Sequence, residues 1–275
     1  MSGVRGAAGI GASGMYDAFE DAQVRVESDQ PVSRAQAKAL AARIERAYAS
    51  DSSLQRWEDH GPLRQQLTVA VLSPQHFADF TGDTTGAIAG VTTGPNTIVV
   101  PERVLRGTTL DDEDTLAHEL AHVQDFREAG DGIASVPTYL EEGKAYVLGD
   151  AYAREPRHLA DVARTMAALS ADDVAYLLKN FRQASAERRP PQFVYAGEVM
   201  GALFVEYLAT HVKRDAVVRL CDAVEATGHG QRFTDAFKKS FGLSLPAVEQ
   251  RFVDFVRETE GEPGRRLAGT LYAPH

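Results

Sequence analysis

The order of strand-like and helix-like segments limits this chain most strongly, because strand patterns occur only before residue 102. The segment AQVRVES (22–28) alternates between apolar and polar residues, and LTVAVLS (67–73) is a β-branched apolar run. GAIAGVTTGPNTIVVP (86–101) reads as two strands joined by the turn signal TGPN. We expect helices over 34–50 and 74–80 between these four strands.

The remainder of the chain has helical patterns only. Its clearest element is TTLDDEDTLAHELAHVQDFREAG (108–130), which Thr109 can cap and Gly130 can end. Further helices are predicted over 137–153, once or twice within 157–180, and over 193–212, 216–227, 232–241 and 245–258. Strands followed by helices predict an α+β protein.

This order also suggests how the chain is organised. We expect a flexible arm over residues 1–14, an α+β amino lobe over 15–130, a helical carboxyl lobe over 131–260 and a loose tail over 261–275. An active site is then expected in the cleft between the two lobes.

Composition narrows the possible partners and locations. Apolar residues make up 44% of the chain and charged residues 25%, as in globular proteins. A net charge of −10 argues against nucleic acid and anionic membranes as partners. No stretch is long and apolar enough for a membrane span, and no signal peptide is seen, so we expect a cytoplasmic protein, or a secreted one if a signal has been removed. The single cysteine, Cys221, is expected to be a buried thiol.

The pentapeptide HELAH (118–122) carries the chemistry. Histidines four residues apart share one face of a helix, so His118 and His122 can bind one metal ion. Glu119 lies on the flank of this pair, where its carboxylate can take a proton from metal-bound water. The motif also arises by chance, about once or twice in a hundred chains of this composition. The opposite face of the helix carries apolar residues for the core, namely Leu116, Leu120 and Val123.

A third ligand is available downstream in YLEEGKAYV, where Glu142 follows His122 by 20 positions. With this segment the chain resembles the gluzincin metallopeptidases, in particular the peptidase-MA-like proteins. Their ligand lies in a segment of the form W-L-x-E-G-x-A, which residues 139–145 match with tyrosine in place of tryptophan. The likeness extends over about residues 20 to 258. We also expect Gly143 to ease close approach of this helix to the HELAH helix.

The resemblance implies one zinc ion per chain, held by His118, His122 and Glu142, with a water at the fourth position. It implies hydrolysis of a peptide or protein substrate, with Glu119 as general base and TIVVP (97–101) as the edge strand beside the substrate. No G-x-M-E-N segment is present, which favours an endopeptidase over an aminopeptidase. Two alternatives remain: a non-catalytic metal-binding scaffold or binding module, and an interaction protein whose HELAH is accidental.

The oxyanion of the reaction needs a hydrogen-bond donor besides the metal. In this family a tyrosine often precedes the helix that here contains GALFVEYL, but Glu198 stands at that position. Tyr195 lies one turn earlier and is the preferred donor. Weaker candidates for that role are Tyr146, Tyr207 and His211. Asp125 or Asp150 could accept a hydrogen bond from a metal-bound histidine, and the substrate and oligomeric state stay open.

Overall fold

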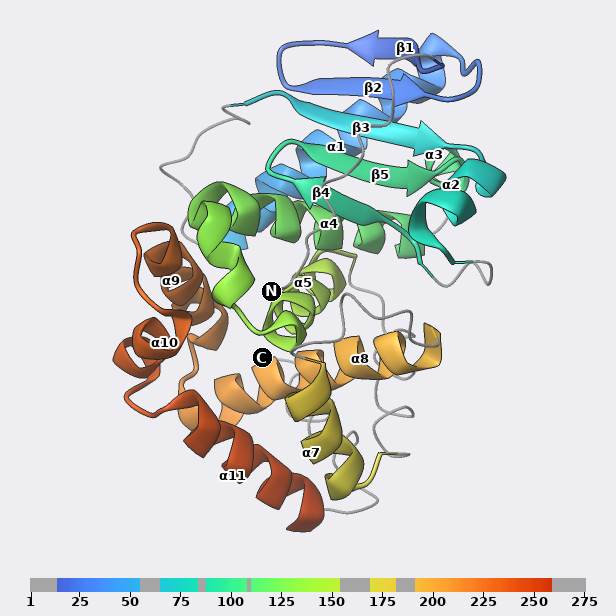
Figure 1. Cartoon of the computed structure of the whole chain (residues 1–275). Helices are drawn as coiled ribbons and strands as arrows, with labels where there is room; N and C mark the ends of the chain where they lie inside the picture. The colour runs from blue at the N-terminus through green and yellow to red at the C-terminus, as the bar shows by residue number, and fades with distance from the viewer. Residues whose placement is uncertain are drawn as a thin grey trace. The chain divides into compact units, whose positions relative to one another are not determined.

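The computed structural model describes residues 14–54, 65–83, 88–107, 110–153, 169–181 and 191–258 (Figure 1). Within these ranges the protein is mixed α+β, with a five-stranded sheet and ten α-helices, which confirms the predicted class. The expected tail over 261–275 lies outside the described residues, as does the expected arm except for Gly14.

One mixed sheet contains all the described strands. They are β1 (Tyr16–Glu20), β2 (Val24–Ser28), β3 (Leu67–Leu72), β4 (Val91–Gly94) and β5 (Thr97–Pro101). Their order in the sheet is β1-β2-β3-β5-β4, with β2, β3 and β5 parallel and the two edge strands antiparallel to their neighbours. The parallel centre explains the almost continuous apolar sequence of β3, because both faces of such strands are covered.

The expectation that TIVVP forms an edge strand is wrong. This segment is β5, which pairs with β3 on one side and with β4 on the other. The turn at Pro95 and Asn96 returns the chain into the sheet, so the second strand of the hairpin lies inside and the first lies at the edge. The other edge strand, β1, was not predicted, because YDAFE has no clean alternation and contains a register shift.

Helices cover both faces of the sheet (Figure 1). On one face α1 (Arg34–Leu54) and α4 (Leu110–Ala129) contribute to a shared core with the strands. On the other face α2 (Pro74–Thr81) packs through Phe77. Since side chains alternate along a strand, Ile98 of β5 belongs to the first core and Val99 to the second.

The helical part of the chain follows the predicted pattern closely. Gly130 ends α4 with a positive φ of 52°, as expected, whereas the expected cap Thr109 lies outside the described residues. Helix α8 begins two residues before the predicted start at 193, since Pro191 is suited to a first helical turn. The remaining helices are α3 (Arg103–Arg106), the 3-10 helix η2 (Gly130–Ser135), α5 (Thr138–Ala153), α7 (Ala171–Asn180), α8 (Pro191–Tyr207), the π-helix η4 (Leu208–Val212), α9 (Ala216–Gly228), α10 (Phe233–Phe241) and α11 (Leu245–Glu258).

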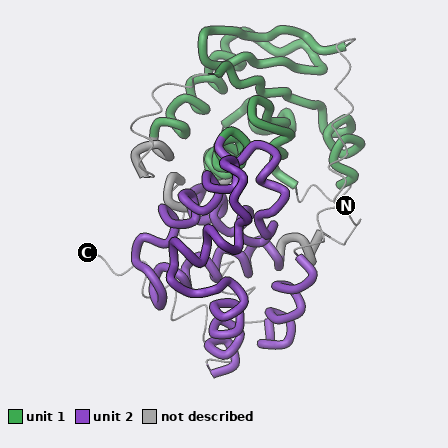
Figure 2. Tube along the Cα trace, turned by 60° about the vertical axis from the view of Figure 1, so that its left-hand side comes forward, with its two compact units in different colours: residues 1, 3–127, 151–153 green, residues 2, 128–150, 154–275 purple. Residues whose placement is uncertain are grey.

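The chain divides into two compact units (Figure 2). The first runs to Arg127 and includes Ala151–Ala153, and the second contains Glu128–Asp150 and the residues from 154 onward. The core of the second unit joins α5 to the later helices and is rich in phenylalanine. Cys221 is buried on α9, as predicted.

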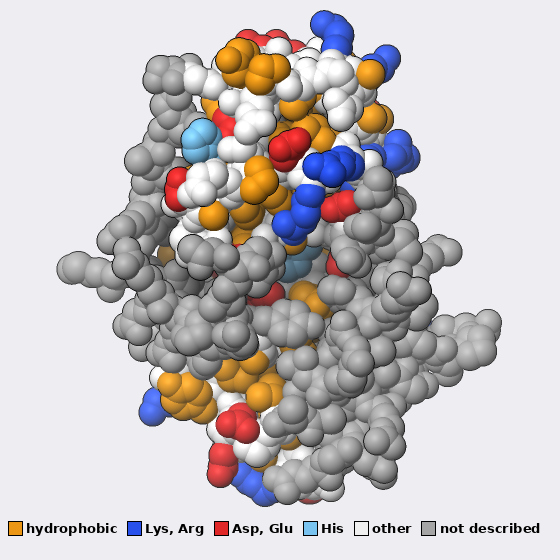
Figure 3. All heavy atoms as spheres, turned by 90° about the vertical axis from the view of Figure 1, so that its right-hand side faces the viewer, with side chains coloured by type: hydrophobic (Ala, Val, Ile, Leu, Met, Phe, Trp, Pro, Cys, Tyr) orange, Lys and Arg blue, Asp and Glu red, His pale blue; other side chains and the backbone are white. Residues whose placement is uncertain are grey.

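The described surface carries both charged and apolar side chains, as the composition implies. On the face drawn in Figure 3, the described acidic, basic and apolar side chains are interspersed. None of the described helices is both long and apolar enough to cross a membrane.

Candidate metal centre

One side of helix α4 is buried in the core of the first unit, and the two histidines of the HELAH motif lie on its other side. Leu116 and Leu120 are fully buried against the sheet and α1, as predicted. The first turn is also attached to α1, since Arg43 donates to Glu113 at 2.5 Å. His118 and His122 are each half-buried, so they lie away from this core and keep some contact with solvent.

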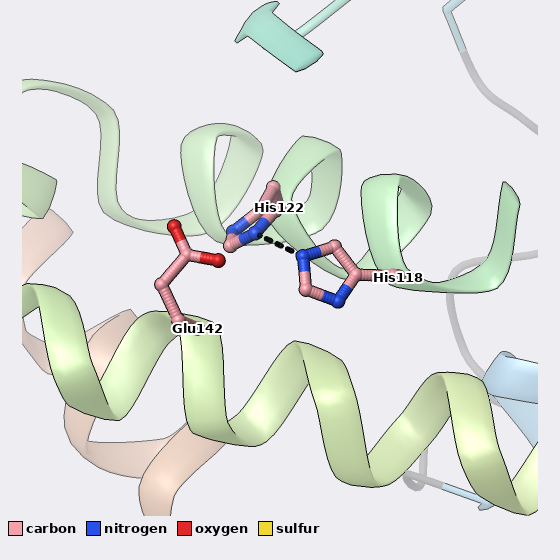
Figure 4. Close-up of side chains that lie close together, drawn as sticks. All are labelled: His118, His122 and Glu142. Atoms are coloured by element: carbon pink, nitrogen blue, oxygen red, sulfur yellow. Dashed lines mark hydrogen bonds between the residues drawn. The ribbon is translucent and has the colours of Figure 1, made fainter. Parts of the chain in front are cut away.

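The structure brings the three predicted metal ligands together. The Nε2 atoms of His118 and His122 lie 3.1 Å apart, and their rings meet edge to face. Ligand atoms of the two histidines and Glu142 all lie within 4.8 Å of one another. Figure 4 shows the histidines on neighbouring turns of α4 and the Glu142 carboxylate reaching toward them from α5.

This arrangement fits a zinc ion. Zinc binds imidazole nitrogen at about 2.0–2.1 Å and carboxylate oxygen at about 2.0–2.2 Å, so two ligand atoms of one tetrahedral ion lie about 3.4 Å apart. The two nitrogens are close to this separation, and the carboxylate needs a shift of roughly 1.5 Å or less. Two imidazoles and one carboxylate form a donor set typical of catalytic zinc sites.

Glu119 is buried beside the histidine pair, with only 5% of its surface exposed. The Thr92 hydroxyl lies 2.8 Å from its Oε2 and 2.9 Å from its backbone oxygen. Gly90, just before β4, leaves room for the same side chain: a Cβ there would come within 2.9 Å of the Glu119 Cγ. The sequence analysis missed both Thr92 and Gly90, because only the tertiary fold brings β4 onto α4.

The orientation of Glu142 follows from a close helix crossing, which differs from the one we expected. A Cβ on Gly143 would overlap the backbone of Gly201 on α8, and a Cβ on Gly201 would overlap the carbonyl oxygen of Tyr139. Gly143 therefore allows α5 to approach α8, and the expectation that it serves the approach to the HELAH helix is wrong. Glu141 points about 100° away from Glu142 and is half-buried.

The same helix contains a buried charge that the sequence analysis did not single out. Lys144 is 1% exposed, and its Nζ lies 4.0 Å from the Cys221 Sγ on α9. An ammonium group is costly to bury. The burial of Lys144 shows that this side of α5 lies inside its unit.

The candidate oxyanion donors differ in their burial, and the side chain of one of them lies outside the described residues. Tyr195 belongs to α8, but its side chain lies outside the described part of the protein. Tyr146 lies one turn after Glu142 on α5 and is buried. Tyr207 is buried and stacks on the exposed His211 at 4.7 Å between ring centroids, and burial raises the pKa of its phenol.

Two aspartates, Asp125 and Asp150, are candidates to accept a hydrogen bond from the metal-binding histidines. Asp125 is 1% exposed and therefore is not the solvated surface residue that its helical position allowed. The side chain of Asp150 lies outside the described residues.

Comparison with known proteins finds no protein-family model that matches this chain and no curated protein sequence with significant similarity. The chemistry of the site itself is therefore what points to a function.

Proposed function

We propose that this protein is a zinc-dependent peptidase of the gluzincin type, with one zinc ion held by His118, His122 and Glu142. The observation that carries the proposal is the convergence of two imidazole nitrogens and one carboxylate beside a buried glutamate. A chance HExxH on a surface helix would bring neither the third ligand nor the buried carboxylate.

The proposed reaction is attack of a water molecule on a peptide carbonyl. A bound zinc ion supplies Lewis-acid polarisation and lowers the pKa of water toward about 7. Glu119 takes the proton of the attacking water as general base and later gives it to the leaving amine as general acid. Its burial excludes competing solvent from the carboxylate, and Thr92 holds one of its oxygens.

The substrate is proposed to be a peptide or protein that lies along β4. This strand is an edge of the sheet and is half-buried, and Thr92 links it to the glutamate on α4. An extended peptide can pair with the free main-chain groups of such an edge, and this mode suits cleavage inside a chain. Strand β4 thus takes the role that the sequence analysis gave to TIVVP.

Tyr195 remains the proposed oxyanion donor. Tyr195→Phe is expected to lower turnover by about 100- to 1000-fold while zinc content stays unchanged, because one transition-state hydrogen bond is lost. Steady-state kinetics and metal analysis of the same preparation test this. An effect below about threefold would transfer the role to Tyr146, Tyr207 or His211, tested in the same way.

The proposal is tested by metal analysis followed by incubation with a peptide library, with and without a chelator. About one equivalent of zinc and chelator-sensitive cleavage are expected. Glu119→Gln should keep the zinc and lose nearly all hydrolysis, because an amide fills the same space but cannot act as a base. Zinc without cleavage of any peptide would favour the alternative, a non-catalytic metal-binding scaffold or binding module. Absence of zinc would reject the site.

A further inference from the structure

The register of the β-hairpin turns Thr92 of β4 toward α4. Thr92 pairs with Ile98 of β5, whose side chain lies in the core shared with α4. Val91 pairs with Val99, and both belong to the core on the α2 side. Because side chains alternate, Thr92 faces α4 together with Ile98, and its hydroxyl reaches Glu119 there. The register shift between Thr92 and Gly94 places Thr93 at a bulge.

The two oxygens of the Glu119 carboxylate have different surroundings. Oε2 accepts a hydrogen bond of 2.8 Å from the Thr92 hydroxyl. Oε1 accepts none from the residues that the structure describes, and it lies on the side of Gly90, where a Cβ would come within 3.1 Å of it. The single proton of the hydroxyl is shared between Oε2 and the Glu119 backbone oxygen at 2.9 Å, so one carboxylate oxygen is held and the other accepts no hydrogen bond from the described residues.

We propose that Thr92 is a positioning residue for the general base: its hydroxyl fixes Oε2 of Glu119, so that Oε1 faces the reacting water. This inference rests on the proposed function of the site. A buried carboxylate with free torsions would sample several orientations, and a charge-assisted hydrogen bond from a strand restricts it to one. Because the donor is on edge strand β4, the base and the proposed substrate-binding edge are held in one rigid arrangement.

The kinetic test compares three variants of the zinc-loaded protein. Thr92→Val keeps the shape of the side chain but removes the donor, and it should lower kcat by on the order of 10- to 100-fold with KM and zinc content unchanged. Thr92→Ser keeps the hydroxyl and should remain within about threefold of the parent protein. Thr93→Val makes the same change at the next residue, which has no hydrogen bond to Glu119 among the described residues, and should have an effect below about twofold. If Thr92→Val does not fold, Thr92→Ala replaces it in the comparison with Thr92→Ser.

A second measurement uses the metal-free protein and does not depend on activity. Thr92→Val should lower the urea midpoint of unfolding by about 0.5 M, since it removes a hydrogen bond to a buried carboxylate. In a Glu119→Ala background the same change should shift the midpoint by less than about half as much, because only the hydrogen bond to the backbone oxygen of residue 119 is left to lose.

The outcomes separate the two proposals. A parent protein that binds no zinc and cleaves no peptide would overturn the proposed function and this inference with it. A parent protein that is active while Thr92→Val stays within threefold of it would overturn the role of Thr92 alone. Loss of zinc in Thr92→Val, or equal midpoint shifts in both backgrounds, would show that Thr92 has only a structural role.

Discussion

At the scale of single residues, adjacent side chains of identical chemistry have different environments. Glu141 and Glu142 differ only by one step along α5, yet Glu142 is the one whose carboxylate lies with the histidine nitrogens. On β4 the Thr92 hydroxyl bonds Glu119, whereas the adjacent Thr93 has no such bond among the described residues. A helix turns by about 100° per residue and a strand by about 180°, so one step is enough to remove a side chain from the site.

The pair on α5 provides a sharp prediction. Glu142→Ala should weaken zinc binding by at least about tenfold and lower activity with it, because two histidines alone hold zinc poorly. Glu141→Ala is the matched control and should keep zinc bound with a modest change in activity. Competition with a chromogenic zinc chelator measures both affinities. The opposite result would mean that α5 is rotated relative to the register described above.

Glu206 on α8 predicts a pH dependence of stability. Burial raises the pKa of its carboxyl from the ordinary 4.5 to about 7, and its Oε2 has no hydrogen-bond partner among the described residues. The folded state therefore binds this proton more tightly than the unfolded state, and stability falls as the pH rises from about 4.5 to about 7.

Glu206→Gln should remove this dependence, because the amide stays neutral. We expect the variant to be more stable than the parent protein by roughly 1–3 kcal/mol at pH 8 and nearly equal to it at pH 4. Urea unfolding at the two pH values checks the difference. A constant difference at both pH values would contradict the assignment to Glu206.

At the scale of elements, the crossing of α5 and α8 determines how the third ligand is presented. Two glycines, Gly143 and Gly201, lie against each other's helix backbone, and neither helix has space for a methyl group there. This contact leaves α5 little freedom to rotate, and the direction of Glu142 depends on that rotation.

Gly143→Ala is therefore expected to lower both the stability of the protein and its affinity for zinc. It should destabilise the protein by at least about 2 kcal/mol, because the added Cβ must push apart two backbones rather than a flexible side chain. It should also weaken zinc binding, since α5 can relieve the overlap only by moving. Thermal unfolding and zinc titration measure the two effects. Ala175→Leu adds more atoms at an exposed position of α7 and should change stability by less than about 0.5 kcal/mol.

At the scale of the whole molecule, the proposed ion would link α4 to α5, helices that η2 joins along the chain. A ligand that binds only the folded state stabilises it, by about 2.7 kcal/mol at one hundred times its dissociation constant. Added zinc should then raise the midpoint of thermal unfolding by about 5–10 °C.

Calorimetry with added zinc, and after removal of metal by a chelator, checks this effect. His118→Ala should unfold at the same temperature under both conditions, because it lacks one of the three ligands. His229→Ala changes an exposed histidine that directly follows α9, and this variant should keep the full zinc response. A zinc response in His118→Ala equal to that of the parent protein would place the bound metal elsewhere.

Much of the architecture could be predicted because it depends on local periodicity. The 3.6-residue pattern located most of the described helices after residue 107. Alternation of apolar residues located β2, an apolar run located β3, and the turn signal TGPN located the hairpin. Spacing, together with the resemblance of residues 139–145 to the gluzincin ligand segment, grouped His118, His122 and Glu142, since two ligands share one helix face and the third lies on the next helix. These signals arise from neighbours in the chain and need no knowledge of the fold.

Only the tertiary structure decided which strand lies at the edge and what surrounds the base. The sequence of TIVVP is compatible with an edge or an interior strand, and the pairing with β3 decides between them. The contact of Thr92 and Gly90 with Glu119 joins residues more than twenty-five positions apart. A glycine at position 143 suggests that two helices approach closely, but it does not identify the partner helix, which is α8. Each of these facts depends on contacts between distant segments, and a single sequence contains no local pattern for them.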